Sequence, residues 1–328
     1  MISTTLEQNP TGVSLIFCKK SMKESRNQRI VLDSIERAGI TLHMKREDEL
    51  HPFISGNKYR KLKYNLLEAK TKGAKTLLSF GGAYSNHISA LAYAGKKYGF
   101  KTIGVIRGDE LGESLETTLN NNTTLKQAFE NGMRFKFISR ADYRYKQTDD
   151  FIASLREEFG NFYMVPEGGT NDLAIKGCEE ILTEMDQDYD FICVAAGTGG
   201  TISGLINSAF NGQKILGFPS LKGLFLEDEI EKLTPAKSNW KLIHNYHFGG
   251  YAKINENLIS FINEFYRQTT IPIDPVYTGK MMFGITDMIK NNYFNKNCKI
   301  LAIHTGGLQG ISGMNQRLLK KNLPLINV

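Results

Sequence analysis

The chain has 328 residues with a net formal charge of +7, and 41% of its residues are hydrophobic. It can build one large or two medium domains around a sizeable core. Its cations are scattered, with no basic tract that carries interleaved aromatic residues, which argues against nucleic-acid binding. No segment approaches 18 consecutive apolar residues, so we expect no membrane association.

Short apolar runs alternate with amphipathic stretches along the chain. The apolar runs predict strands over residues 42–45, 76–80, 102–107, 134–138, 162–166, 191–196, 214–219 and 300–304. The amphipathic stretches predict helices over residues 57–72, 85–98, 114–130, 149–158, 172–185, 201–211, 256–267 and 279–292. Fully apolar strands that alternate with helices are typical of buried parallel sheets, so the sequence predicts an α/β fold.

Glycine pairs follow four of the predicted strands. They lie at residues 81–82, 168–169, 199–200 and 306–307. Because open parallel sheets bind ligands at the carboxyl ends of their strands, these turns are expected to converge on one crevice. The alternative is that glycine serves only to reverse the chain tightly.

Lys58 begins the helix predicted over residues 57–72, in the run Ser-Gly-Asn-Lys-Tyr-Arg-Lys-Leu. An amine at such a junction can form a Schiff base with an aldehyde cofactor. The segment 197–201, Gly-Thr-Gly-Gly-Thr, connects a predicted strand to a predicted helix and suits a phosphate group. A lone lysine is more often a solvated surface group, and we expect the neighbouring cations Arg60, Lys61 and Lys63 to be solvated. The two motifs together indicate pyridoxal phosphate (PLP).

Two commoner phosphate-binding motifs do not fit the glycine-rich segment. A dinucleotide fingerprint needs glycine where the chain has Ile202. A P-loop that starts at Gly199 needs lysine where the chain has Leu205. A compact monophosphate, bound by turn amides and hydroxyls, remains.

The cysteines form neither a zinc pattern nor a disulfide framework, and we expect no metal. They are Cys18, Cys178, Cys193 and Cys298, and no two have C-x-x-C spacing. This spacing and a polar N-terminus without a cleavable apolar segment predict a reducing, cytoplasmic location.

The run around Lys58 resembles the Schiff-base lysine motif of the 1-aminocyclopropane-1-carboxylate (ACC) deaminase / D-cysteine desulfhydrase family. These are PLP enzymes of fold type II, with the two-domain tryptophan synthase β-like fold and parallel sheets flanked by helices. Further blocks match in the family's order, at residues 45–48, 81–87, 166–171, 274–280 and 304–307. The resemblance covers about residues 42 to 310. It implies a large domain formed by residues 1–63 and 167–328, and a small domain formed by residues 64–166.

The resemblance also implies roles for matching residues. The expected PLP-binding residues are Lys58, Asn86, Gly197, Thr198, Gly199, Gly200, Thr201, Thr278 and Thr305. The expected catalytic residues are Lys58, Ser85, Tyr251 and Tyr277. Ser85, Asn86 and His87 are expected to contact the substrate. For the two tyrosines the alternative is an ordinary buried or interfacial aromatic residue, and for His87 it is a local hydrogen bond.

Thr278 separates the two activities of the family. ACC deaminases carry a glutamate there, facing the pyridine nitrogen, whereas D-cysteine desulfhydrases carry threonine. A neutral hydroxyl favours an unprotonated ring and a weaker electron sink, which is sufficient to expel a β-thiolate. Thr305 is the alternative partner of the ring nitrogen. The chain departs from the family at Tyr84, where glutamine is common, and at residues 27–40 and 121–124.

The sequence therefore predicts a PLP-dependent lyase, with hydrolase as a secondary label, that carries out α,β-elimination on a small β-substituted amino acid. D-Cysteine, giving pyruvate, ammonia and hydrogen sulfide, is the first candidate. The alternatives are ACC deamination, β-replacement of the cysteine synthase type, and a non-catalytic PLP- or metabolite-binding protein. The resemblance implies a homodimer.

Overall fold

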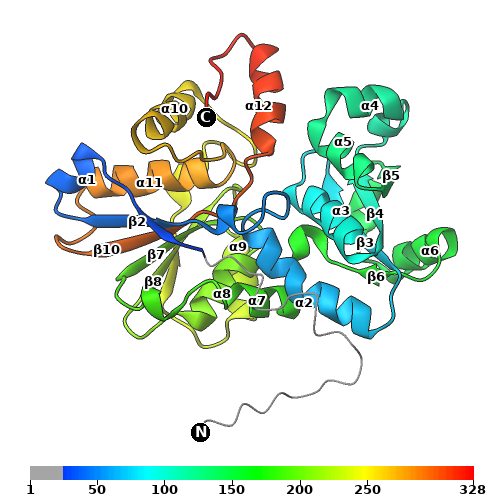
Figure 1. The fold of residues 1–328 in the computed structure, drawn as a ribbon, viewed down its shortest axis with the longest axis horizontal. Helices are drawn as coiled ribbons and strands as arrows, with labels where there is room; N and C mark the ends of the chain where they lie inside the picture. Colours follow the sequence, from blue (N-terminus) through cyan, green and yellow to red (C-terminus); the bar gives the residue numbers. More distant parts are fainter. Residues whose placement is uncertain (1–24) are drawn as a thin grey trace, which may run out of the picture.

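The computed structural model describes residues 25–328, in which two separate sheets are linked by helices (Figure 1). Cys18 and the polar N-terminal segment lie outside the described residues. The first sheet has the order β1-β2-β10-β7-β8-β9. Its strands are β1 (Asn27–Arg29), β2 (Thr41–Lys45), β10 (Lys299–Ile303), β7 (Phe191–Ala196), β8 (Lys214–Pro219) and β9 (Trp240–Leu242). The second sheet has the order β5-β4-β3-β6. Its strands are β5 (Met133–Ile138), β4 (Lys101–Arg107), β3 (Thr76–Gly82) and β6 (Tyr163–Met164).

All strand pairs in the two sheets are parallel except β1 with β2, which is antiparallel. The eight predicted strands are confirmed, with ends that differ by up to a few residues. The sequence does not predict β1 and β9, which lie at the edges of the first sheet and have three residues each. An edge strand can be short and polar because only one of its sides pairs, so neither leaves an apolar run.

Helices cover both faces of the first sheet, with α10 and α11 on one face and α7 and α8 on the other (Figure 1). The α-helices are α1 (Asp33–Arg37), α2 (Asn57–Thr71), α3 (Asn86–Tyr98), α4 (Leu115–Asn121), α5 (Thr123–Glu130), α6 (Asp149–Phe159), α7 (Asp172–Cys178), α8 (Gly200–Ser208), α9 (Phe225–Leu233), α10 (Glu256–Thr269), α11 (Thr278–Lys290) and α12 (Gly310–Leu319). Short 3₁₀ helices lie at Glu47–Glu49, Asp109–Gly112, Asp142–Tyr145, Glu167–Gly169, Glu184–Asp186 and His244–Tyr246.

Two predicted helices are wrong in extent, and in each predicted range a side chain caps a new start. The helix predicted over 114–130 is two helices, since the Asn122 carbonyl oxygen accepts from the Leu125 amide at 2.9 Å and starts α5. The helix predicted over 172–185 ends at Cys178, and Thr183 and Asp186 form a capping box for a separate turn. Helices α1, α9 and α12 are not predicted.

Helix α2 lies between the two sheets and is held closely against α7 (Figure 1). A Cβ atom at Gly177 would lie 2.0 Å from the carbonyl oxygen of Arg60, so only glycine permits this approach. The buried Arg60 guanidinium also donates to the Glu47 carboxylate, at 2.8 and 2.9 Å. These contacts fix the position of the helix that carries Lys58.

Strands β3 to β6 fall within the small domain predicted over residues 64–166, and the predicted boundary at residue 63 lies inside α2. The domain boundaries stay a prediction. Within residues 25–328, no helix is both long enough and apolar enough to cross a membrane.

Candidate active site

Lys58 is the second residue of α2, and the protein around its amine disfavours the protonated form. The side chain is partly buried, and Nζ donates to the Asn57 side-chain oxygen at 3.1 Å. Burial, and to a lesser extent the charge of Lys61, lowers the pKa of Lys58 to about 7. Roughly half of the amine is therefore neutral at pH 7, as a nucleophile that attacks an aldehyde requires.

The glycine-rich segment lies next to this lysine and forms a cradle. The amide nitrogen of Asn57 donates from its side chain to the Thr201 hydroxyl at 2.8 Å, which ties the start of α2 to the start of α8. Gly199 precedes α8 with φ of +83° and offers no capping side chain, so the first backbone N–H groups of the helix need a partner. A Cβ atom at Gly200 would lie 3.0 Å from the Thr170 hydroxyl and 3.1 Å from Lys61 Nζ. These features suit an anion.

Lys61 is a site residue that the sequence analysis assigned to the solvent, and that assignment is wrong. It is 2% exposed, one helical turn after Lys58. Its Nζ donates to the Gly168 carbonyl at 3.1 Å and to the hydroxyls of Thr170 and Thr198 at 2.9 and 3.4 Å. Burial lowers the pKa of Lys61. Arg60, also expected in solvent, is buried, and Lys63 pairs with Glu180 at 2.7 Å. The i, i+3 spacing of the two lysines was the available signal.

Ser85, Asn86 and His87 form the start of α3 and face different surroundings. The Ser85 hydroxyl caps the helix by accepting from the Ile88 amide at 3.3 Å, and it remains able to donate. Asn86 is half-buried, and its Oδ1 accepts from Gln309 at 2.9 Å. The His87 ring is 1% exposed, with Nε2 2.9 Å from the Ser79 hydroxyl. This geometry supports the local role of His87, and a direct substrate contact stays a prediction.

Tyr277 and Tyr251 lie together at the start of α11. Their rings are 6.2 Å apart at 68°, and a Cβ atom at Gly197 would lie 3.4 Å from the Tyr277 hydroxyl oxygen. Tyr277 therefore borders the glycine-rich segment, while Tyr251 is 44% exposed. Burial is the first cause that raises the pKa of each phenol, well above the usual value for Tyr277. Both stay protonated at neutral pH and can donate a hydrogen bond.

Thr278 is fully buried, and its hydroxyl is held by Asp274. Oγ1 donates to the Asp274 carboxylate at 2.7 Å and accepts from the Asp274 amide at 2.8 Å. The same carboxylate accepts from the amides of Val276, Tyr277 and Thr278 at 2.8 to 2.9 Å. Asp274 thus caps α11 and places a negative charge one hydrogen bond behind Thr278. The sequence analysis did not single out this residue.

Thr305 is buried beside the start of α2. Its carbonyl oxygen accepts from the Asn57 amide at 3.3 Å. Within the part of the chain that the structure describes, its hydroxyl has no hydrogen-bond partner, in contrast to that of Thr278. The Thr305 hydroxyl is therefore able to donate to a ring nitrogen, whereas the Thr278 hydroxyl, whose proton is engaged by Asp274, is able to accept from one.

Lys280 connects α11 to the loop that carries Tyr251. Its Nζ donates to the carbonyls of His247 and Gly250, both at 2.8 Å, and the residue is 2% exposed. Burial lowers the pKa of Lys280 to about 8. The ammonium thus holds the residue before Tyr251 in place.

The buried Lys280 makes the stability of the protein depend on alkaline pH. Because its folded pKa is about 8 and its unaltered pKa is 10.5, the folded state binds fewer protons between these values. The free energy of unfolding is therefore expected to rise from pH 8 to pH 10.5 by about 1–3 kcal/mol through this group. Urea unfolding at pH 7 and pH 10 measures this rise, and Lys280→Met should lack that contribution. Equal pH slopes in both proteins would contradict it.

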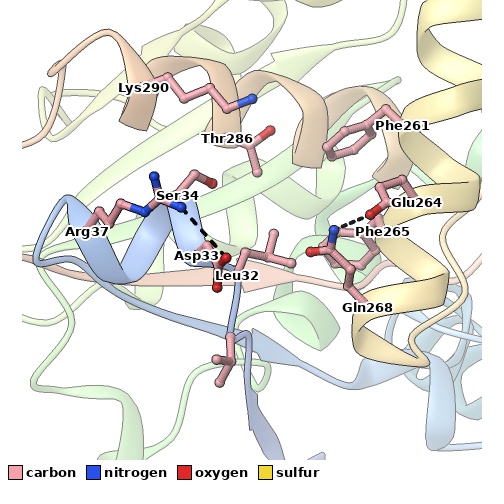
Figure 2. A pocket seen from close by; sticks show the side chains of 11 residues that line it. Leu32, Asp33, Ser34, Arg37, Phe261, Glu264, Phe265, Gln268, Thr286 and Lys290 are labelled. Atoms are coloured by element: carbon pink, nitrogen blue, oxygen red, sulfur yellow. Dashed lines mark hydrogen bonds and ion pairs between the residues drawn. The ribbon is translucent and has the colours of Figure 1, made fainter.

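A cavity of about 600 Å³ lies elsewhere, between α1, α10 and α11 (Figure 2). Two pairs of its polar lining residues interact: Arg37 lies 3.7 Å from Asp33, and Gln268 bonds to Glu264. Thr286 donates to backbone carbonyls of its own helix. The cavity contains none of the candidate catalytic residues.

The arrangement around Lys58 fits PLP. The cradle left by Gly200, the buried Lys61 ammonium and the start of α8 suit a phosphate, and the Lys58 amine lies one helical turn from Lys61. The α/β fold with this pair of features defines a PLP enzyme of fold type II.

Comparison with known proteins supports this class. The family model described as "Pyridoxal-phosphate dependent enzyme" matches residues 30–306. A putative ACC deaminase of Thermotoga maritima is 31% identical, over 87% of this chain and 94% of its own length. The bifunctional D-cysteine desulfhydrase/ACC deaminase, mitochondrial, of Arabidopsis thaliana is 29% identical over 83% of this chain and 74% of its own. The crystal structure of an ACC deaminase homologue superimposes with a TM-score of 0.75 at 27% identity, covering 95% of this chain and 99% of that one.

The chain thus belongs to the ACC deaminase / D-cysteine desulfhydrase family of PLP-dependent enzymes. The predicted fold, cofactor and enzyme class are confirmed. The secondary label hydrolase is wrong, because a desulfhydrase breaks a carbon–sulfur bond by elimination, which is lyase chemistry.

Proposed function

We propose that this enzyme eliminates the β-substituent of a small amino acid, with D-cysteine as the preferred substrate and pyruvate, ammonia and hydrogen sulfide as products. The observation that carries the proposal is Thr278, a neutral residue at the start of α11 where ACC deaminases have glutamate. When bound, PLP draws electrons from the α-carbon of the substrate amine. A neutral partner of its ring limits this withdrawal, which suits the departure of a β-thiolate.

The other residues are assigned roles that follow from their positions. Lys61, Thr198, Thr201 and the amides of the glycine-rich segment bind the phosphate. Lys58, with its lowered pKa, holds the cofactor and then takes the substrate's α-proton. Tyr277, whose phenol keeps its proton, donates to the substrate or its leaving group. Ser85 binds the substrate carboxylate with the hydroxyl that remains free to donate.

ACC deamination is the second candidate, and Asp274 favours it. Its carboxylate accepts the Thr278 hydroxyl at 2.7 Å, which makes the hydroxyl oxygen a better acceptor. A hydrogen bond to that oxygen would stabilise a protonated ring nitrogen, and a protonated ring withdraws electrons more strongly.

The two candidates are separated by measuring keto-acid release from D- and L-cysteine, D-serine, β-chloroalanine and ACC. We expect the highest kcat/KM with D-cysteine. A preference for ACC would overturn the proposal, and replacement of the β-substituent without keto-acid release would favour the cysteine synthase type of reaction.

Thr278→Glu tests the role of this position directly. A carboxylate there should raise the proton affinity of the ring nitrogen, which over-stabilises the negative charge at the α-carbon and slows departure of the thiolate. We expect kcat for D-cysteine to fall about tenfold, which corresponds to about 1.4 kcal/mol. Thr278→Gln, of the same size but neutral, controls for the loss of the bond to Asp274. A larger loss in the glutamine variant than in the glutamate variant would contradict the electrostatic argument.

The cytoplasmic location and the homodimer expected from the sequence are also part of the proposal. The three described cysteines, Cys178, Cys193 and Cys298, are buried free thiols, which is compatible with a reducing compartment. Sedimentation of the holoenzyme tests the dimer.

A further inference from the structure

The start of helix α12 makes three contacts with segments next to the second sheet, close to the candidate site. Nε2 of Gln309 donates to Oδ1 of Asn86 at 2.9 Å. The Tyr84 ring lies against Gly313, where a Cβ atom would be 2.5 Å from the ring carbon Cε1. The hydroxyls of Ser312 and Thr123 are 2.8 Å apart. Of these contacts, only that of Gln309 reaches a candidate site residue.

The hydrogen bond from Gln309 engages the oxygen end of the Asn86 amide. Gln309 presents its Nε2, which donates to Oδ1 of Asn86 and leaves Nδ2 on the opposite side. Nδ2 lies over Gly307, where a Cβ atom would be 3.0 Å from it and 3.3 Å from the Asp274 carboxyl carbon. Within residues 25–328, Nδ2 of Asn86 makes no hydrogen bond. A donor is thus held in a fixed direction without a protein acceptor.

We propose that Gln309 is a positioning residue that keeps the Asn86 amide with its N–H groups toward the cofactor's ring hydroxyl. The proposal rests on PLP binding at Lys58 and on the place assigned to Asn86. An oxygen on the ring is stabilised by an N–H donor and is repelled by the lone pairs of an amide oxygen. A reversed Asn86 amide would therefore oppose the cofactor even though every other contact is unchanged.

Gln309→Glu tests the proposal because glutamate has the same length but its carboxylate accepts hydrogen bonds. It should draw Nδ2 of Asn86 toward itself and turn Oδ1 toward the cofactor. We expect PLP to bind the apoenzyme roughly 10- to 100-fold more weakly. We also expect the visible absorption band of the holoenzyme, or the pH at which it changes, to shift. Gln309→Met loses the bond without reversing the amide and should show a smaller change of the same kind.

Ser312→Ala is the matched control, since it removes the bond to Thr123 and a long bond to the Gln309 carbonyl, of 3.4 Å, without touching Asn86 or the Gln309 side chain. It should leave PLP affinity and the band unchanged. Wild-type affinity and band in Gln309→Glu would overturn the proposal, as would an equal loss in Ser312→Ala, which would assign the effect to helix docking. If the glutamate variant does not fold, an unchanged band and affinity in Gln309→Met overturns it.

These readouts separate the proposal from the proposed reaction. They measure cofactor binding and absorption without substrate, so a wild-type enzyme that is inactive on D-cysteine still reports on Gln309. Absence of PLP binding by the wild-type protein would instead remove the basis of both.

Discussion

Replacement of Lys58 by alanine is expected to abolish turnover and covalent attachment of PLP. The two other buried amines of the candidate site are already engaged, that of Lys61 by Gly168, Thr170 and Thr198 and that of Lys280 by the carbonyls of His247 and Gly250. The pKa of Lys58 is lowered to about 7 and its amine bonds only to the Asn57 side chain, so we expect it to be the reactive lysine. We expect kcat to fall at least 10³-fold, since the variant lacks the group that holds the cofactor and moves the proton.

Borohydride reduction followed by peptide mapping locates the covalent link. In the wild-type protein the pyridoxyl group should be on the peptide that contains Lys58. Lys70→Ala, an exposed position on the same helix, should retain both the link and the activity. A pyridoxyl group on any other lysine, or on none, would disprove the assignment.

Replacement of Lys61 by methionine is expected to reduce PLP affinity about 100-fold. A charge-assisted hydrogen bond contributes roughly 1.5–3 kcal/mol, and the upper end is expected because the buried ammonium would face the phosphate with little solvent screening. Burial of the Lys61 ammonium is unfavourable, as its lowered pKa indicates, and methionine removes this cost. The apoenzyme of the variant should therefore be as stable as the wild-type apoenzyme or more so. Titration with PLP and thermal unfolding of the apoenzyme measure the two opposite effects.

A variant of Lys61 that binds PLP normally would show that this cation only joins the Gly168 turn to the glycine-rich segment. Loss of apoenzyme stability together with loss of affinity would point to the same structural role. Lys63→Met, which removes a cation on the same helix paired with Glu180, serves as the control and should leave PLP affinity unchanged.

Strands that are buried on both faces could be predicted from the sequence, and those at edges could not. β7 and β8 match the predictions at both ends because each is a continuous apolar run. β1 has the sequence Asn-Gln-Arg and exists only because β2 supplies a partner. Such a strand forms by pairing with a distant strand, so the local periodicity of the sequence does not predict it.

The candidate site divides in the same manner. Lys58 and the glycine-rich segment could be found because their chemistry and spacing are visible in the sequence. Lys61 and Gln309 could not, because each makes its contacts in the site with segments that are distant in the sequence. Lys61 in particular looks like an exposed helix cation until Gly168 and Thr198 are brought to it by the fold.

The contact between Gly177 and Arg60 fixes the position of α2, and with it the two lysines of the candidate site. Lys58 and Lys61 lie three residues apart on α2, a rise of about 4.5 Å along the axis. The helix therefore fixes the distance between the two lysines that would bind the two ends of one small molecule. Because the backbone of α7 touches that of α2 at Gly177, any side chain there would displace α2. Gly177 is not a candidate site residue, yet it thus determines the positions of both Lys58 and Lys61.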